Sequence, residues 1–244
     1  MVLGSVINIW DGVELLRGSM TCMKGHVDHF IIVYQPRSNF GEEYNPLADI
    51  QAAIDGFENV TLIQYTPVMY KREHTGMRNE KAKRNLGIET ARRLGCSHFL
   101  HIDVDEYYED FGAAKQAYID SGHHGSVCKM WTYFKKPTWR LENPENYYVP
   151  FIHRLTQNTF VGPQYPFYVD RTRRVNQNDV VLLEGVMMHH FSWVRKDIAR
   201  KCRNSSAKNL SQHLGEYETA QVGKRLAMYD QRLIEVPNIF NIEI

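Results

Sequence analysis

The sequence predicts an α/β fold in which a mixed, mainly parallel sheet is flanked by helices. Between residues 5 and 105, short apolar runs alternate with helix-like segments, which is the pattern of crossover units in a parallel sheet. Residues 125–168 are instead rich in aromatic residues and proline, and they contain short strand-like runs. A chain of 244 residues is long enough for one large domain with a full core.

The strands predicted in the first half are short runs of β-branched, aromatic and other apolar residues. The segments between them are long enough for one helix each, so right-handed crossover connections are expected. The predicted strands cover residues 5–10, 29–34 and 60–65, and a fourth run ends at Asp103.

Capping patterns predict the helices between these strands. Asp11 stands three residues before Glu14, which is the spacing of a capping box at the start of a first helix. Asn45 is predicted to be an N-cap, with Pro46 at the first helical position. A third helix is predicted over about residues 79–94, ahead of the strand that ends at Asp103.

The second half of the chain predicts a different arrangement. Residues 125–168 are expected to form two or three irregular β segments, among them a strand-like run over residues 126–134. Helices are expected over about 195–205 and about 207–225. Residues 233–244 are apolar and are expected to be extended and to pack on the body of the protein.

Composition excludes several classes of protein. The apolar and charged fractions, 43% and 23%, are ordinary for a soluble globular chain, and the formal net charge of +1 gives no field that would recruit nucleic acid. No apolar run approaches the roughly 20 residues of a membrane helix, and no secretory signal is visible. The four cysteines form no C-x-x-C pair. Reduced thiols and a cytoplasmic location are therefore expected.

The tripeptide Asp103-Val104-Asp105 is the most informative feature of the sequence. It follows the apolar run of residues 99–102, so both carboxylates are expected near the carboxyl edge of the sheet, where open α/β sheets bind ligands. Carboxylate oxygens suit a hard cation such as Mn²⁺ or Mg²⁺, which bridges to substrate phosphates. A D-x-D tripeptide alone is not specific, because Asp also favours turns.

A group of basic residues precedes this strand. Cations and free helix N–H groups beside a metal held by carboxylates would form a diphosphate site. The alternative is a solvated basic helix face. The group consists of Lys71, Arg72 and Arg78 in the loop, and of Lys81, Lys83, Arg84 and Asn85 in the first turns of the predicted helix, where Asn85 adds a polar side chain.

A histidine pair lies late in the sequence, within residues 187–193. A histidine can supply one nitrogen ligand among the oxygens around Mn²⁺. His189 and His190 are adjacent, so on a strand they point to opposite faces and only one is expected to bind. The alternative is a strand with one buried, hydrogen-bonded histidine and one exposed histidine. A second pair, His123 and His124, is expected in a loop.

Three segments in this order resemble the GT-A-fold glycosyltransferases, and most of all their family 2-like members. They are residues 83–88 (KRNLGI), 95–108 (GCSHFLHIDVDEYY) and 190–195 (HFSWVR). The resemblance covers residues 5–200 and implies a GT-A-type, Rossmann-like sheet with a β-rich acceptor half and C-terminal helices. It also implies a metal-dependent hexosyl- or pentosyltransferase that moves a sugar from a nucleoside-diphosphate sugar to a hydroxyl acceptor.

The resemblance divides the chain into parts and assigns roles. Residues 1–244 would form one domain, with a nucleotide-sugar-binding half at 1–108, an acceptor half at 109–195, and C-terminal helices and tail at 196–244. The implied metal residues are Asp105 as direct ligand, His190, and Asp103 as a ribose or metal-water contact. The implied donor-binding residues are Asp11, Lys81, Arg84, Asn85 and Asp103, although Asp11 is also a candidate N-cap.

The general base is less defined. Inverting members use a carboxylate in the acceptor half, and this sequence has no clear match to their patterns. Glu184 and Asp170 are candidates by region only, so the inverting and retaining reactions stay open. The implied acceptor is a glycan or a lipid-linked glycan. A modified nucleic acid is conceivable because basic and aromatic residues coexist, but the net charge does not favour it.

Two other classes compete with this interpretation. A sugar-phosphate nucleotidyltransferase shares a metal and phosphate site on a related sheet, but it carries a glycine-rich basic loop after the first strand, where this chain has Trp10-Asp11-Gly12-Val13. A non-catalytic nucleotide-binding module would keep the fold without turnover. The sequence contains no P-loop, G-x-G-x-x-G, G-x-S-x-G or H-E-x-x-H motif.

Overall fold

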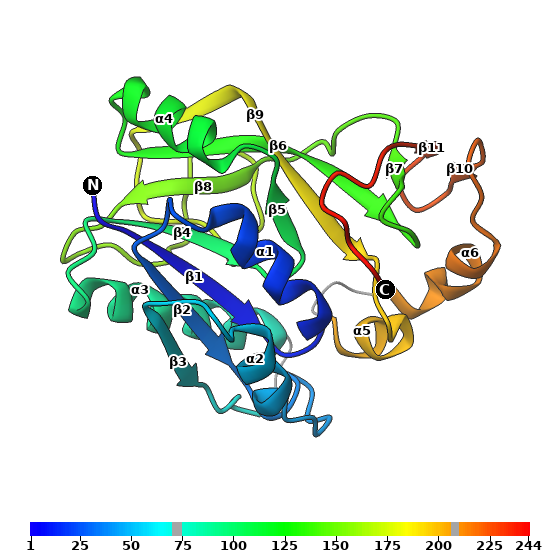
Figure 1. The fold of residues 1–244 in the computed structure, drawn as a ribbon, viewed down its shortest axis with the longest axis horizontal. Coiled ribbons are helices and arrows are strands. Elements are labelled where there is room, and N and C mark those ends of the chain that lie inside the picture. The colour runs from blue at the N-terminus through cyan, green and yellow to red at the C-terminus, as the bar shows by residue number, and fades with distance from the viewer. Residues whose placement is uncertain (70–74, 206–209) are drawn as a thin grey trace.

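The computed structural model describes residues 1–69, 75–205 and 210–244. It is a mixed α/β structure with a mainly parallel central sheet that is flanked by helices, as predicted (Figure 1). Among the described residues, eleven strands join into one sheet in the order β10-β11-β7-β6-β8-β4-β1-β2-β3, and β9 pairs with β5 and β6. None of the helices in these ranges is long and apolar enough to span a membrane.

Four parallel strands form one end of the sheet, with β3 at its edge. Their order, β3-β2-β1-β4, means that the chain moves to one side of β1 and then returns to its other side. The switch point therefore lies between β1 and β4, where Asn8 and Asp103 are register partners. The four predicted strands are confirmed as β1 (Leu3–Ile9), β2 (His29–Tyr34), β3 (Val60–Gln64) and β4 (His98–Asp103).

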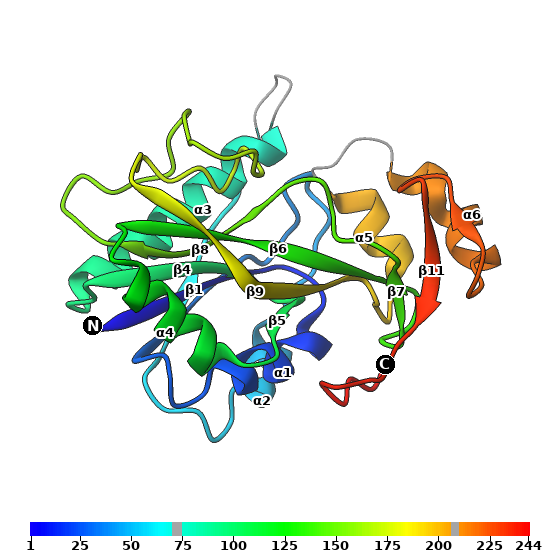
Figure 2. The ribbon, with the colours of Figure 1, turned by 90° about the horizontal axis from the view of Figure 1, so that it is seen from above.

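Helices cover both faces of this parallel part of the sheet. Helix α3 lies on one face, and α1, α2 and α4 lie on the other (Figure 2). Side chains alternate along β1, so Val6 packs towards α3 while Ile7 belongs to the larger core on the opposite face. Gly87 lets α3 approach β1, because a β-carbon there would lie 2.1 Å from Val6 Cγ1. The helices are α1 (Leu16–Met23), α2 (Leu47–Ala53), α3 (Thr75–Arg93) and α4 (Phe111–Ser121).

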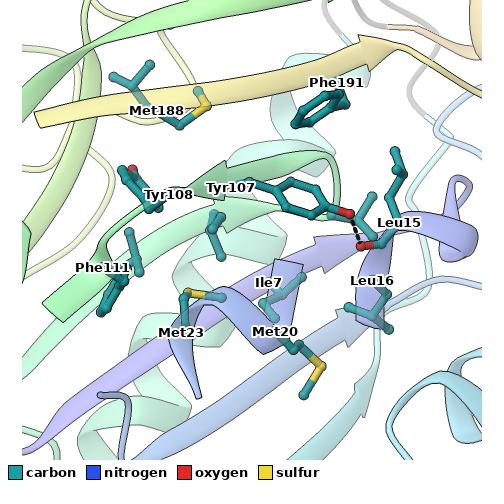
Figure 3. Close-up of a cluster of buried hydrophobic side chains, with 14 of the residues drawn as sticks. Ile7, Leu15, Leu16, Met20, Met23, Tyr107, Tyr108, Phe111, Met188 and Phe191 are labelled. Atoms are coloured by element: carbon teal, nitrogen blue, oxygen red, sulfur yellow. Dashed lines mark hydrogen bonds between the residues drawn. The ribbon is translucent and has the colours of Figure 1, made fainter. Parts of the chain in front are cut away.

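The larger core joins the two halves of the chain. Figure 3 shows Leu16 and Met20 of α1 on one side of this cluster, and Met188 and Phe191 of β9 on the other. Tyr107 lies between them, and its hydroxyl donates a hydrogen bond to the Leu15 carbonyl oxygen at 2.6 Å. Burial of these apolar side chains holds β9 against β5, the short strand that follows β4.

Strand β9 (Val180–Trp193) places the histidine pair beside the acidic motif. It runs parallel to β6 (Gly125–Phe134) and antiparallel to β5 (Glu106–Tyr108), with Glu106 opposite His190 in the register. The remaining strands are β7 (Trp139–Leu141), β8 (Val149–Arg154), β10 (Arg225–Leu226) and β11 (Gln231–Glu235). The expected β-rich second half is confirmed.

Several predictions of local structure are wrong. Asp11 is not an N-cap: Gly12 precedes the 3-10 helix Val13–Leu15, and no side chain caps it. Helix α2 begins at Leu47 with Pro46 as its N-cap, although Asn45 Oδ1 still accepts a hydrogen bond from Leu47 N–H at 3.2 Å. Helix α4 is present although the sequence patterns used above do not predict it.

The C-terminal region agrees with the prediction in part. Helix α5 spans Ile198–Asn204, and short helices span Leu210–His213 and Leu214–Thr219. The start of the predicted helix over 207–225 falls in residues 206–209, which lie outside the described residues. Its helical part ends at Thr219, and residues 225–226 form β10.

Candidate active site

A polar cavity of about 200 Å³ lies at the carboxyl ends of β1, β2 and β4, beside the switch point of the sheet. Three parts of the chain meet there: the strand ends, helix α3, and the segments around Asp170 and α5. Most of the side chains that line it are polar or charged, among them Asn8, Trp10, Asp11, Gln35, Lys83, Arg84, Asp103, Asp105, Asp170, Arg195 and Lys201.

Buried polar atoms without partners gather around this cavity. Both amide atoms of Asn8, Trp10 Nε1 and Gln35 Oε1 have no hydrogen-bond partner among the described residues. The same holds for Nε and Nη1 of both Arg84 and Arg195. Buried polar groups are nearly always hydrogen-bonded, so ordered water or a polar ligand is expected to complete the contacts of these atoms.

Asp103 is held by two arginines. Arg84 Nη2 donates to both carboxylate oxygens, at 3.0 and 3.1 Å, and Arg173 Nη2 contacts Oδ2. Burial raises the pKa of Asp103, but the charges of Arg173 and Arg84 outweigh it, and the net pKa lies well below the usual value. Asp103 is therefore an anion across the physiological pH range.

Glu106 shares Arg173 with Asp103 in a more buried position. It is 2% exposed, and its Oε2 accepts hydrogen bonds at 2.9 Å from both Arg173 Nη1 and the Asp103 backbone N–H. Burial, reinforced by the charge of Asp103, raises the pKa of Glu106 to about 7 despite the opposing effect of Arg173. The cost of burying the charged form outweighs the attraction of Arg173, so Glu106 retains its proton in mildly acidic solution.

This raised pKa predicts a pH effect on stability. The unfolded chain loses the Glu106 proton near pH 4.5, whereas the folded chain keeps it up to about pH 7. The stabilisation from Glu106 is therefore complete below about pH 4.5 and is lost as the pH rises to about 7. Relative to E106Q, the unfolding free energy of the wild type should fall by about 1–3 kcal/mol across this window. Urea unfolding in EDTA at several pH values measures this change in unfolding free energy. Parallel pH profiles of the wild type and E106Q would contradict the raised pKa of Glu106.

Asp105 lies in a second cluster of charges. It is 3% exposed, and its Oδ2 lies 2.5 Å from Arg195 Nη2, 3.3 Å from Lys201 Nζ and 3.7 Å from His190 Nε2. Burial raises its pKa, but Arg195 and Lys201 outweigh this effect and hold the net pKa well below the usual range. The D-x-D carboxylates are thus both ionised, each with its own set of cations.

Gly12 makes room for Arg195. Its φ is 75°, and a β-carbon on it would lie 1.3 Å from Arg195 Nη1. Arg195 therefore passes through space that only glycine leaves open.

We expect G12A to push Arg195 from Asp105 and to lower the unfolding free energy by about 2–4 kcal/mol, because backbone strain adds to a disturbed buried ion pair. Gly25 is the matched control, since its φ is 82° and a β-carbon there meets nothing within 4 Å. G25A should cost about 1 kcal/mol by thermal or urea unfolding. Equal losses in the two variants would show that Arg195 is not confined by Gly12.

The two histidines of β9 point to opposite sides, as predicted. His189 Nδ1 lies 2.9 Å from the Tyr133 hydroxyl, away from the cavity, whereas His190 faces Asp105. Burial lowers the pKa of each to about 4, so both are neutral imidazoles at pH 7. A neutral imidazole nitrogen is the form that binds a metal ion.

The described residues offer one set of three candidate metal ligands. Donor atoms of Asp105, Glu106 and His190 all lie within 4.8 Å of one another. Two carboxylates and one imidazole are a donor set that Mn²⁺ accepts, so the residues fit the expected divalent ion. Asp103 stands outside this set, with its oxygens on Arg84 and Arg173. Within the set, both oxygens of Glu106 also contact Arg173, so a bound ion would have to share Glu106 with that guanidinium. Direct metal contact by Asp103 stays a prediction.

The other predicted site residues divide into two groups. Asp11 and Asp170 line the cavity, and Asp170 Oδ1 accepts hydrogen bonds from the Thr172 N–H and hydroxyl at 2.6 and 2.7 Å. Lys81, Asn85 and Glu184 do not line it. Asn85 Oδ1 instead accepts from Val161 N–H at 2.7 Å, and Glu184 is largely exposed and lies 3.7 Å from Lys129. Lys71 and Arg72 lie outside the described residues.

Sequence reasoning missed several residues of the site. Lys83, rather than Lys81, lines the cavity, because Lys83 and Arg84 share the face of α3 that packs on the sheet. The spacing of Gly87, Ile88 and Ala91 along the helix could have identified that face from the sequence. The other missed residues are Asn8, Trp10, Gln35, Glu106, Arg173, Arg195 and Lys201.

Comparisons with known proteins found similarity only among solved structures. No family model and no curated protein matches the chain. A crystal structure of S. aureus TarS has a TM-score of 0.48 and 13% identity, and the match covers 89% of this chain and 43% of TarS. This chain thus spans less than half the length of that TarS chain.

Two further structures show weaker similarity. S. aureus TarS 1-349 in complex with UDP-GlcNAc has a TM-score of 0.45 and 13% identity, with 89% of this chain and 72% of that chain covered. A mannose-1-phosphate geranyltransferase from Thermus thermophilus has a TM-score of 0.32 and 13% identity, with 64% and 51% covered. At these scores and identities, the similarities assign neither a family nor an activity to this chain.

Proposed function

We propose that this protein is a nucleotide-sugar-dependent glycosyltransferase that moves a hexosyl or pentosyl unit to a hydroxyl acceptor. The observation that carries the proposal is the cavity at the switch point, where free buried donors and acceptors stand beside the D-x-D carboxylates. A nucleoside-diphosphate sugar needs polar contacts for its base and ribose and cations for its phosphates. The cavity offers both within one site.

The free polar atoms divide according to the parts of such a donor. Asn8, Trp10 and Gln35 offer uncharged donors and acceptors, which suit a nucleobase and ribose. Arg84 offers two unpartnered N–H positions, and Lys83 lies one residue away on the same helix face. Arginine N–H groups match phosphate oxygens, so this side of the cavity would take the diphosphate.

A divalent ion completes the proposal. Asp105, Glu106 and His190 would hold Mn²⁺ or Mg²⁺, with Asp103 at the ribose or at a metal-bound water. When bound, such an ion stabilises negative charge on phosphate oxygens as a Lewis acid. The residues of the chain would add to this effect, because the guanidinium groups of Arg84 and Arg195 line the same cavity and are held in place by Asp103 and Asp105.

A general base is needed if the reaction inverts the sugar. Asp170 is the better candidate of the two predicted carboxylates, because it lines the cavity and Thr172 orients it. Glu184 lines a separate cavity between α4 and β9. A carboxylate within hydrogen-bond reach of an acceptor hydroxyl removes its proton as the new bond forms. The anomeric configuration of the product distinguishes inversion from retention.

The proposal is tested with a panel of UDP-, GDP- and dTDP-sugars and MnCl₂, in which released nucleoside diphosphate is measured. One donor should give turnover that EDTA removes. D170N should then lower kcat by about a hundredfold or more with little change in donor binding, whereas E184Q should match the wild type. Release of pyrophosphate would indicate a nucleotidyltransferase, and no binding of any donor would contradict the proposal. The acceptor (glycan, lipid-linked glycan or modified nucleic acid) and the cytoplasmic location stay predictions.

A further inference from the structure

The oxygen of Asp105 that faces His190 already has two cationic partners. Arg195 Nη2 and Lys201 Nζ lie 2.5 and 3.3 Å from Oδ2, and the side chains of both cations have little exposure, 5% and 15%. The protein's own cations thus occupy the side of the carboxylate that a divalent ion would use. Both cations come from the segment that joins β9 to α5 and from α5 itself.

Arg195 and Lys201 differ in their freedom to leave this oxygen. Arg195 is confined, because its Nη1 fills the space beside Gly12. Lys201 carries a flexible four-carbon stem, and among the described carboxylates it forms an ion pair only with Asp105. Its side chain also lines the cavity. Lys201 is therefore the cation that can exchange places with another ion.

A divalent ion and the Lys201 ammonium oppose each other at Asp105, since like charges at such short distances repel strongly where water is scarce. The displaced ammonium needs a new counter-ion. Asp11 and Asp170 also line the cavity, but no ion pair links either of them to Lys201 among the described residues. A bound diphosphate would bring negative charge into the same cavity, within reach of a rotated lysine.

We propose that Lys201 is an internal cation that blocks the metal site at Asp105 until a diphosphate binds and attracts it away. Metal and diphosphate then bind to this protein cooperatively, because each removes an electrostatic cost for the other. The inference rests on the proposed function for the source of the diphosphate. The blocking of Asp105 by Lys201 rests on the ion pair alone.

Equilibrium dialysis of the full chain against MnCl₂, without nucleotide, tests the block. K201M should bind Mn²⁺ at least about tenfold more tightly than the wild type, because the competing charge is gone. K201R keeps the charge and should match the wild type. K196M is the second control, since Lys196 stands next to Arg195 but lines the neighbouring cavity. Equal Mn²⁺ affinities of K201M and the wild type would overturn the proposal. If circular dichroism shows that K201M is unfolded, K201Q is used in its place.

The same dialysis with inorganic pyrophosphate or UDP on both sides tests the coupling. Pyrophosphate should raise the Mn²⁺ affinity of the wild type by at least about tenfold and that of K201M by much less. An equal gain in both proteins would overturn the coupling. If pyrophosphate acts as expected but UDP, GDP and dTDP do not bind, the role of Lys201 stands and the nucleotide-sugar proposal fails.

Discussion

Replacing Asp105 with asparagine is expected to lower metal-dependent donor turnover by at least about a thousandfold. The variant keeps the shape of the side chain but removes the charge that would bind the ion between Asp105, Glu106 and His190. It also leaves Arg195 and Lys201 without their counter-ion, which should lower the unfolding free energy by about 3–5 kcal/mol. Turnover is measured on folded protein, at a temperature well below the midpoint of thermal unfolding of the variant.

The control is another aspartate-to-asparagine change. Asp230 is exposed, and its ion pair with Arg225 lies at the surface, so D230N should keep full turnover and leave the unfolding free energy nearly unchanged. Turnover near the wild-type rate in D105N would show that Asp105 holds no catalytic ion. A loss of stability without a loss of turnover would leave Asp105 with a structural role only.

Replacing Arg173 with methionine is expected to cost about 3–5 kcal/mol of stability at pH 8. Arg173 is the buried cation shared by Asp103 and Glu106, so its removal leaves two carboxylates close together with Arg84 alone. Protonation relieves that repulsion, and the raised pKa of Glu106 places the relief near neutral pH. The deficit should therefore shrink as the pH falls from 8 to 5.

R174M is the matched control for this prediction. Arg174 is the next residue, and its Nη1 donates to the Pro163 carbonyl oxygen at 3.1 Å rather than to either acidic group. Its loss should cost about 1 kcal/mol and should not depend on pH between 5 and 8. Urea unfolding of both variants in EDTA at pH 5 and pH 8 gives the four values needed. A deficit in R173M that is the same at both pH values would contradict the shared-cation model.

The central strands and the acidic motif could be predicted because both depend on local sequence. Apolar runs such as residues 99–102 are buried on both faces of the sheet, and the carboxylates follow where the strand ends. His190 could be predicted to face the opposite way from His189, since side chains alternate along a strand. Helix α4 was missed although Asp110, whose side chain accepts from Ala113 N–H, is an ordinary N-cap signal.

The charged partners could not be predicted, because long-range packing places them. Arg173 lies in a segment without regular structure, beside Arg171 and Arg174, and the sequence does not say which of the three enters the core. Glu106 follows the D-x-D tripeptide, yet its burial depends on β9 pairing with β5. The choice of Lys83 over its helix neighbours depends on the rotation of α3 about its axis, which contact with β1 through Gly87 sets.

The separation of Asp105 from its counter-ions has a consequence for biosynthesis. Arg195 and Lys201 stand 90 and 96 positions after Asp105. A nascent chain on the ribosome therefore carries the acidic strand end long before the two cations are made. Burying that carboxylate early would be costly, so the first half should stay loosely packed at this edge until α5 has been synthesised. The carboxyl edge of the sheet would then acquire its final packing only after residue 201 has left the ribosome.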